Sequence, residues 1–163
     1  MRGRQGTGKG QARAEDAYSA GRTVGASGLS ALPDGPIILF DAECVLCSAN
    51  AEFILTHDRA ERFHLASMQG DVGAALFRRH GIDPQDPETL LLVDGDRVLK
   101  NSDAVLAIWY GLGWPWKMAG LARIVPRAIR DPVYRLVARN RYRWFGKRKM
   151  CWMAPPEYRS RVL

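Results

Sequence analysis

Two cysteines, Cys44 and Cys47, are the residues of this 163-residue chain whose types and spacing could do chemistry. They follow an apolar run, Ile37–Phe40, and a carboxylate, Asp41, stands three positions before the first cysteine. In a Cys-x-x-Cys at the start of a helix, the thiols can close a small disulfide ring, and the helix dipole favours thiolate. The pattern predicts a redox dithiol, with Cys44 as a nucleophile that a partner's disulfide can reach and Cys47 as the resolving thiol.

Two other interpretations of the cysteines stay open. Free cysteines are often buried as small apolar side chains without any reactivity. They can also bind metal, and a single Cys-x-x-Cys is half of the double motif typical of zinc sites. The ligands of such a Cys₃His zinc site would be Cys44, Cys47 and Cys151 with His57, His64 or His80.

Two carboxylates close to the cysteines bear on their chemistry. Asp41 can accept a proton from Cys47 if burial raises its pKa, or it can cap the turn through free backbone N–H groups. Glu43 places a negative charge beside Cys44, which disfavours the thiolate. Val45 and Leu46 supply no positive charge. We therefore expect a reducing dithiol rather than a strong oxidase.

The hydrophobic pattern around the dithiol predicts an α/β domain. We expect a strand at 37–40, a helix from the cysteines to about His57, a strand at 63–67 and a helix over 70–80 closed by Gly81. Asp94-Gly95-Asp96 predicts a hairpin between strands at 89–93 and 97–99. Ser102 or Asp103 then caps a helix that contains Ile108 and Trp109. The order is β-α-β-α-β-β-α.

The last part of the chain has a helical and basic pattern. Helices are expected at 118–125 and 132–145, separated by Pro126 and Pro132. The apolar but Pro-rich stretch 151–156 is expected to fold back over the domain as an irregular segment, and the final residues to fray.

Charge divides the chain into unequal parts. The net charge of +7 combines +3 over residues 1–33, −7 over 34–116 and +11 over 117–163. The basic end predicts either a solvated face or a weak contact with an anionic membrane surface, and nucleic acid is the less favoured partner. No apolar run reaches the ~20 residues of a membrane-spanning helix. Because no secretory signal precedes the domain and only three cysteines are present, a cytoplasmic location is expected.

Several separated motifs make the chain resemble the DCC-type thiol-disulfide oxidoreductases, a thioredoxin-like family. They are Asp41, Cys44 and Cys47 after Phe40, then Asn101-Ser102-Asp103-Ala104, Arg130-Asp131-Pro132-Val133-Tyr134 and Asn140-Arg141-Tyr142-Arg143-Trp144-Phe145-Gly146. The resemblance covers roughly residues 36–163. Ala42 departs from it, since family members usually have glycine there, and Pro87 lies one position before the place of the thioredoxin cis-proline.

The resemblance and the motifs together give one set of expectations. The chain divides into a disordered tail at 1–33, a thioredoxin-like core at 34–116 and a helical extension at 117–163 packed on the core. The core reduces a disulfide in a protein or small-molecule substrate through Cys44 and Cys47, assisted by Asp41, and an external thiol restores the dithiol. No cofactor is expected. The alternative is a non-catalytic metal-binding or anionic-surface-binding module on the same fold.

Overall fold

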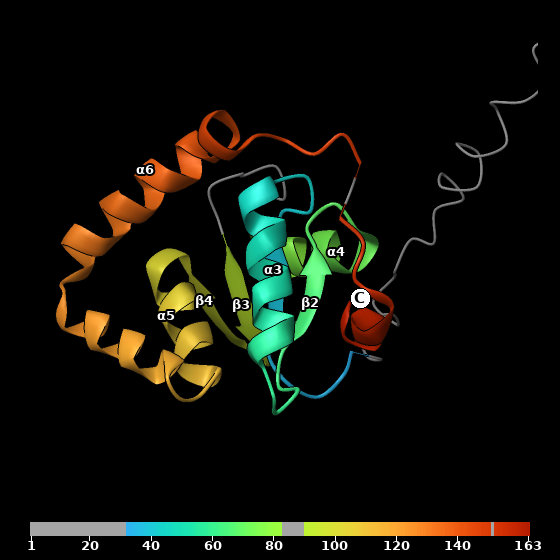
Figure 1. Ribbon diagram of the computed structural model, residues 1–163, viewed down its shortest axis with the longest axis horizontal. Helices are drawn as coiled ribbons and strands as arrows, with labels where there is room; N and C mark the ends of the chain where they lie inside the picture. The colour runs from blue at the N-terminus through green and yellow to red at the C-terminus, as the bar shows by residue number, and fades with distance from the viewer. Residues whose placement is uncertain (1–31, 83–89, 151) are drawn as a thin grey trace, which may run out of the picture.

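The computed structural model describes residues 32–82, 90–150 and 152–163, and its centre is a mixed four-stranded sheet (Figure 1). The strands are β1 (Ile37–Phe40), β2 (His64–Ser67), β3 (Leu91–Asp94) and β4 (Arg97–Lys100), in the order β2-β1-β3-β4. β1 pairs parallel with β2 and antiparallel with β3, and β3 and β4 form the antiparallel hairpin. β1 thus lies inside the sheet, between β2 and β3, and the chain that leaves its end leads into the dithiol.

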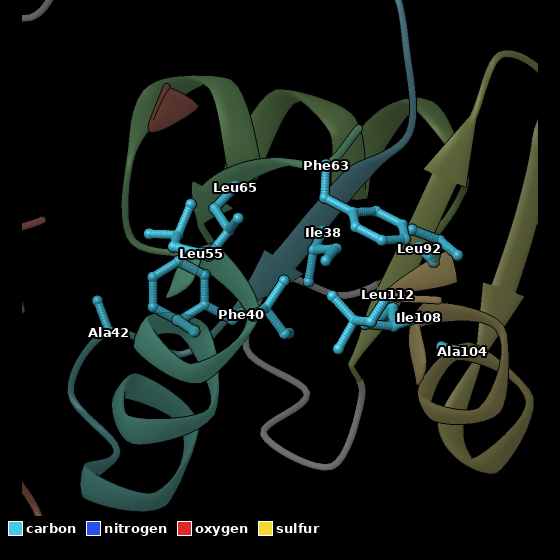
Figure 2. Packing of buried hydrophobic residues seen from close by; sticks show 12 residues of the cluster. Ile38, Phe40, Ala42, Leu55, Phe63, Leu65, Leu92, Ala104, Ile108 and Leu112 are labelled. Atoms are coloured by element: carbon cyan, nitrogen blue, oxygen red, sulfur yellow. The ribbon is translucent and has the colours of Figure 1, made fainter. Parts of the chain in front are cut away.

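Alternation along β1 creates two apolar layers, because successive side chains point to opposite faces of a sheet. Ile38 and Phe40 pack on one face beneath α3 (Val45–His57) and α5 (Asn101–Gly111), as Figure 2 shows for this cluster. Ile37 and Leu39 pack on the other face against α4 (Asp71–Arg79). All four side chains are less than 5% exposed, so β1 is the centre of the core.

The C-terminal third follows the sheet as a separate set of helices. A 3₁₀ segment, η1 (Trp116–Ile124), packs on α5 and leads into α6 (Arg127–Phe145), which contacts α5 and α3. In Figure 1, α6 runs along the outer edge of the molecule, beyond α5 and α3. A short 3₁₀ turn, η2 (Pro156–Arg161), ends the chain beside β2.

The α/β fold class and the order of strands and helices are confirmed. Two expectations for the basic region are wrong. The segment predicted as a helix at 118–125 is 3₁₀. α6 begins at Arg127, five residues before Pro132. A proline near a helix start removes one backbone bond, here the one from position 132 to the carbonyl of Ala128, and the contacts of α6 with α5 offset that loss.

The expected fraying of the last residues is also wrong. The Leu163 N–H donates to the Leu65 carbonyl at 2.8 Å, and Val162 forms a parallel bridge with Leu65. Arg161 is buried, forms an ion pair with Asp58 and donates to the Phe63 carbonyl. A buried charge pair of this kind holds the chain end against β2, because separating it would leave a charge without a partner.

Other expectations concern residues outside the described part of the chain. The predicted tail at 1–33 lies there except for its last two residues, and so do Pro87 and Cys151. Within the described residues, no helix is both long enough and apolar enough to cross a membrane. Ala42, where a glycine was expected, has no left-handed backbone, and its methyl group is buried in the core.

Candidate functional site

The dithiol lies at the start of α3, just after the turn that follows β1. Cys44 is the N-cap residue of α3, with extended backbone angles of φ −84° and ψ 123°. Its Sγ accepts a hydrogen bond from the backbone N–H of Cys47 at 3.2 Å. This is the geometry in which the free N–H groups of a helix start stabilise a negatively charged sulfur. Both cysteines are free thiols.

Exposure differs between the two cysteines. Cys44 has no exposed surface, whereas Cys47 is partly exposed. The sequence predicted that a partner's disulfide could reach Cys44. The structure instead covers this thiol, so access requires a local movement.

The backbone segment Gly146–Arg148, which follows α6, lies along the dithiol turn. The Arg148 N–H donates to the Glu43 carbonyl at 2.7 Å, and Cys44 and Lys147 form an antiparallel bridge. The Lys147 ammonium also pairs with the Glu43 carboxylate at 2.7 Å. Lys147 therefore neutralises the charge of Glu43, which reduces the destabilisation of the Cys44 thiolate that the sequence predicted.

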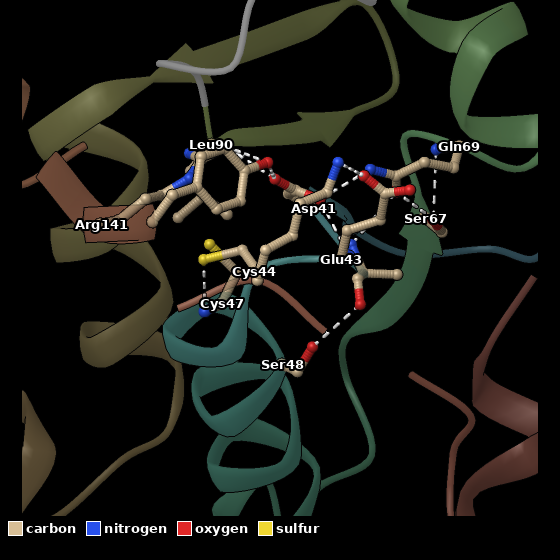
Figure 3. Close-up of polar contacts among 12 residues, drawn as sticks. Asp41, Glu43, Cys44, Cys47, Ser48, Ser67, Gln69, Leu90 and Arg141 are labelled. Carbon is tan, nitrogen blue, oxygen red and sulfur yellow. Dashed lines mark hydrogen bonds and ion pairs between the residues drawn. The ribbon is translucent and has the colours of Figure 1, made fainter. Parts of the chain in front are cut away.

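Asp41 is the centre of a buried polar network beside the thiols (Figure 3). It accepts hydrogen bonds from Gln69 Nε2 at 2.6 Å and from the Glu43 N–H at 2.9 Å. Arg141 pairs with it at 2.7 Å, and the Tyr142 hydroxyl donates to the same carboxylate oxygen as Arg141. The predicted capping of the turn by Asp41 is confirmed by its bond to Glu43.

Arg141 is the residue of this site that reasoning from local sequence missed. It comes from α6, a hundred positions after Asp41, and is 5% exposed. The prediction considered only the neighbours of the cysteines and found no positive charge there. Arg141 supplies that charge, and its one signal in the sequence was its place in the Asn140–Gly146 motif.

The pKa values of the two thiols separate strongly. Hydrogen bonding between the thiols lowers the pKa of Cys44 to about 7; the Cys47 N–H and the charge of Arg141 act in the same direction, and burial opposes them. The contact with Cys44 and burial raise the pKa of Cys47. Cys47 therefore keeps its proton near neutral pH, whereas Cys44 is the thiol that ionises there and becomes mostly thiolate only above pH 7.

The pKa of Asp41 bears on its predicted role as proton acceptor. Burial alone would raise it, but hydrogen bonds from Tyr142, Gln69 and the Glu43 N–H, together with the charge of Arg141, lower it below the ordinary value. A proton acceptor for a thiol works best with a raised pKa. Asp41 instead stays ionised and holds Arg141 beside the cysteines.

The separated motifs of the sequence meet in space around α6. The Ser102 hydroxyl donates to Asp131, and Asp103 pairs with Arg130 at 3.0 Å. The predicted capping of α5 by Ser102 or Asp103 is therefore wrong. Lys100 is the N-cap without a side-chain bond, and the two polar residues bind α6. Their contacts fix the helix that carries Arg141.

The metal alternative gains no support from the described residues. Among them, no three side chains of His, Cys, Asp or Glu gather closely enough to hold a metal ion. His57 lies at the end of α3, where its Nδ1 is 2.8 Å from the Phe53 carbonyl and its ring stacks on Phe53. Cys151, the third predicted ligand, lies outside the described part of the chain.

Comparisons with known proteins point the same way as the geometry. The family model of the DCC1-like thiol-disulfide oxidoreductases matches residues 38–147. The uncharacterised protein YuxK of Bacillus subtilis is 31% identical over 127 residues, which cover 78% of this chain and 93% of that protein. A DCC family protein of Arabidopsis thaliana, described as chloroplastic, is 36% identical over 117 residues, 71% of this chain and 68% of that protein. No solved structure was found to match.

Proposed function

The chain belongs to the DCC1-like thiol-disulfide oxidoreductase family, and we propose that it reduces disulfides with Cys44 as nucleophile and Cys47 as resolving thiol. The observation that carries this proposal is the bond from the Cys47 N–H to Cys44 Sγ at the start of α3. That bond and the lowered pKa favour the thiolate on Cys44. The thiolate is the form that attacks a disulfide.

The exchange takes two steps. The Cys44 thiolate attacks one sulfur of the substrate disulfide, forms a mixed disulfide and releases the other substrate sulfur as a thiolate. Cys47 then passes its proton, directly or through solvent, to the thiolate released in the first step and attacks Cys44 Sγ. This attack releases the second substrate sulfur as a thiolate, which takes a proton from water, and leaves a Cys44–Cys47 disulfide. Two electrons pass from the dithiol to the substrate, and an external thiol donor returns them by the same chemistry.

The pKa of about 7 at Cys44 supports the reducing direction. Among dithiol proteins of this kind, a reductant such as thioredoxin has a nucleophile pKa of about 7, whereas a strong periplasmic oxidant has one near 3.5. A very low pKa stabilises the reduced form and makes a dithiol oxidising. Equilibration with glutathione should therefore place the potential nearer to about −270 mV than to about −120 mV.

Two parts of the site have supporting roles in the proposed reaction. Asp41 and Arg141 are positioning residues, since the carboxylate holds the guanidinium whose charge favours the Cys44 thiolate. A local movement must expose Cys44 before a substrate sulfur reaches it, because that thiol has no exposed surface. The segment Gly146–Arg148, which is hydrogen-bonded to the dithiol turn, is the part that we expect to move. We place the protein in a thiol-reducing compartment such as the cytoplasm, where the dithiol can be restored.

The test compares wild type with single-cysteine variants in an insulin-reduction assay driven by dithiothreitol, with metal analysis of each purified protein. Cys44→Ser should lose activity, and Cys47→Ser should accumulate a mixed disulfide that mass spectrometry assigns to Cys44. The single-turnover rate of wild type should rise with pH through about 7, as the Cys44 thiolate forms. Cys151→Ser, which removes the third thiol, is the matched control and should keep the activity.

Two results would overturn the proposal. Full activity in Cys44→Ser would remove this residue as the nucleophile. Stoichiometric zinc that depends on all three cysteines, without exchange activity, would establish the metal-binding alternative.

A further inference from the structure

An unusual number of large apolar side chains lies exposed on η1 and on the first half of α6. This surface, called the η1–α6 surface below, consists of Met118, Leu121, Ile124, Ile129, Val133 and Leu136. Each of the six is more than half exposed, and Ile124 reaches 80%. Soluble proteins expose apolar residues singly, whereas a contiguous group of them marks a contact with another molecule or with a membrane.

The exposed residues of α6 share one side of the helix. Ile129, Val133 and Leu136 follow the i, i+4, i+7 spacing that places side chains on one face. The buried residues of α6 lie on other sides of the helix: Ala138 is opposite the stripe, and Arg141 is about a third of a turn away from it. The apolar stripe is thus more than half exposed, although Ile129 and Val133 also border a groove that α6 shares with Leu106 of α5. Figure 1 shows that α6 follows the outer edge of the molecule.

The same part of the chain is strongly basic. Residues 117–145 contain eight basic side chains and one acidic side chain, Asp131, which accepts a hydrogen bond from Ser102. Arg123, Arg135 and Arg143 are exposed and form no ion pair within the described part of the chain. Their charge is therefore available to an anionic partner.

We propose that the η1–α6 surface docks on the headgroup region of a bilayer that contains anionic lipids. Its aliphatic side chains enter the boundary between headgroups and acyl chains, and its arginines pair with the lipid phosphates. Trp114 and Trp144, which are 77% and 53% exposed, lie before Met118 and after Leu136, the first and last residues of the η1–α6 surface. Tryptophan is the residue that favours this boundary.

Two other occupants fit these residues less well. Nucleic acid would use the arginines but would leave the aliphatic stripe against a polar backbone of phosphates. A second copy docked on the same surface would cover the stripe but would bring two sets of arginines together. Only an anionic bilayer satisfies both the apolar and the basic side chains.

The docking does not depend on the thiol chemistry, but it would bring the dithiol close to the membrane. The stripe and Arg141 lie on different sides of the same helix, so docking through the stripe would bring α6 and the dithiol site that it completes to the bilayer. A helix with its side chains is about 10 Å across, so Cys44 would work close to the membrane surface.

The experiment is cosedimentation of the full chain with vesicles of pure phosphatidylcholine or of equal parts phosphatidylcholine and phosphatidylglycerol. Binding should require phosphatidylglycerol, weaken with salt and shift the tryptophan emission to the blue. Replacing Arg123, Arg135 and Arg143 together by Gln should weaken binding roughly fivefold per arginine. Replacing Ile124, Ile129 and Leu136 together by Ser should weaken it at least about tenfold and abolish the emission shift.

Matched controls change similar residues on other parts of the surface. Arg78→Gln with Arg159→Gln removes exposed arginines from α4 and η2, and Met153→Ser removes an apolar side chain that is 76% exposed. Both should bind like wild type. Equal loss in the controls, absence of vesicle binding, salt-sensitive binding to duplex DNA in place of vesicles, or a dimer that the Ser variant dissociates would each overturn the proposal.

Discussion

The two halves of α6 invert the usual placement of charge and apolar surface. The first half leaves Ile129, Val133 and Leu136 exposed, whereas the second half buries Arg141 beside Asp41. The buried charge is tolerated because it is paired and hydrogen-bonded. The exposed aliphatic residues, by contrast, are not covered by other side chains of the described residues over more than half of their surface. One helix therefore has a side that completes the dithiol site and a side that leaves large apolar residues exposed.

The largest effect should come from removing the buried charge. Arg141→Met leaves the ionised Asp41 without its cation inside the protein, and the expected loss of unfolding free energy is about 3–5 kcal/mol. Arg143→Met, two positions further along the same helix and exposed, should change it by less than about 0.5 kcal/mol. Urea denaturation of the reduced proteins measures both. Similar losses of unfolding free energy in the two variants would contradict the distinction between the buried and the exposed side of α6.

A smaller effect with a definite pH dependence should follow from Tyr142→Phe, which removes a hydrogen bond to Asp41. The expected loss at neutral pH is about 1.5–3 kcal/mol, the range for a hydrogen bond to a charged group. The folded-state pKa of Asp41 is lowered, so the ionised carboxylate stabilises the folded protein. This contribution to the unfolding free energy is fully present above the unfolded pKa of about 3.9 and is lost as the pH falls through the folded pKa.

The difference between wild type and Tyr142→Phe should therefore narrow in acid. Denaturation curves at neutral pH and near pH 3 test this. Tyr110→Phe, at a tyrosine that is 51% exposed and whose ring lies beneath the Lys117 ammonium, is the control and should leave the unfolding free energy unchanged. A gap that stays constant down to acid pH would contradict the role given to the Asp41 carboxylate.

Cys44 should become more accessible when one backbone hydrogen bond between Gly146–Arg148 and the dithiol turn is removed. Arg148→Pro deletes the N–H that donates to the Glu43 carbonyl at 2.7 Å. Losing a bond worth about 1 kcal/mol should raise the alkylation rate of Cys44 by about fivefold, measured by peptide mapping after iodoacetamide treatment. Lys149→Pro is the control, because the Lys149 N–H donates to no backbone carbonyl among the described residues, and its rate should match wild type.

The smallest effect should belong to the exposed face of α6. Leu136→Ser should change the unfolding free energy by less than about 0.5 kcal/mol, since that leucine is 56% exposed. Ile54→Ala, at a residue of α3 with no exposed surface, should cost about 2–5 kcal/mol in the same urea titration. A comparable loss at Leu136 would mean that the stripe stabilises the fold and is not reserved for a partner.

Much of the core and of the dithiol turn could be predicted from local sequence. The limits of β1 and the end of α3 at His57 agree with the structure, because alternation and helical spacing depend on neighbouring residues. Expectations failed where distant parts of the chain meet. α6 extends through Pro132, the chain end is held by Arg161, and Ser102 and Asp103 bind α6 rather than cap α5.

The candidate site divides in the same way. The Cys-x-x-Cys spacing and the strand before it determined that Cys44 stands at a helix start, since that geometry is built within about ten residues. Only the tertiary structure brings Arg141 against Asp41 and the thiols and pairs Gly146–Arg148 with the dithiol turn. Long-range charge pairs depend on how α6 packs, and no local pattern encodes that packing. The sequence therefore determined where the two thiols stand, and the fold decided their protonation and their exposure.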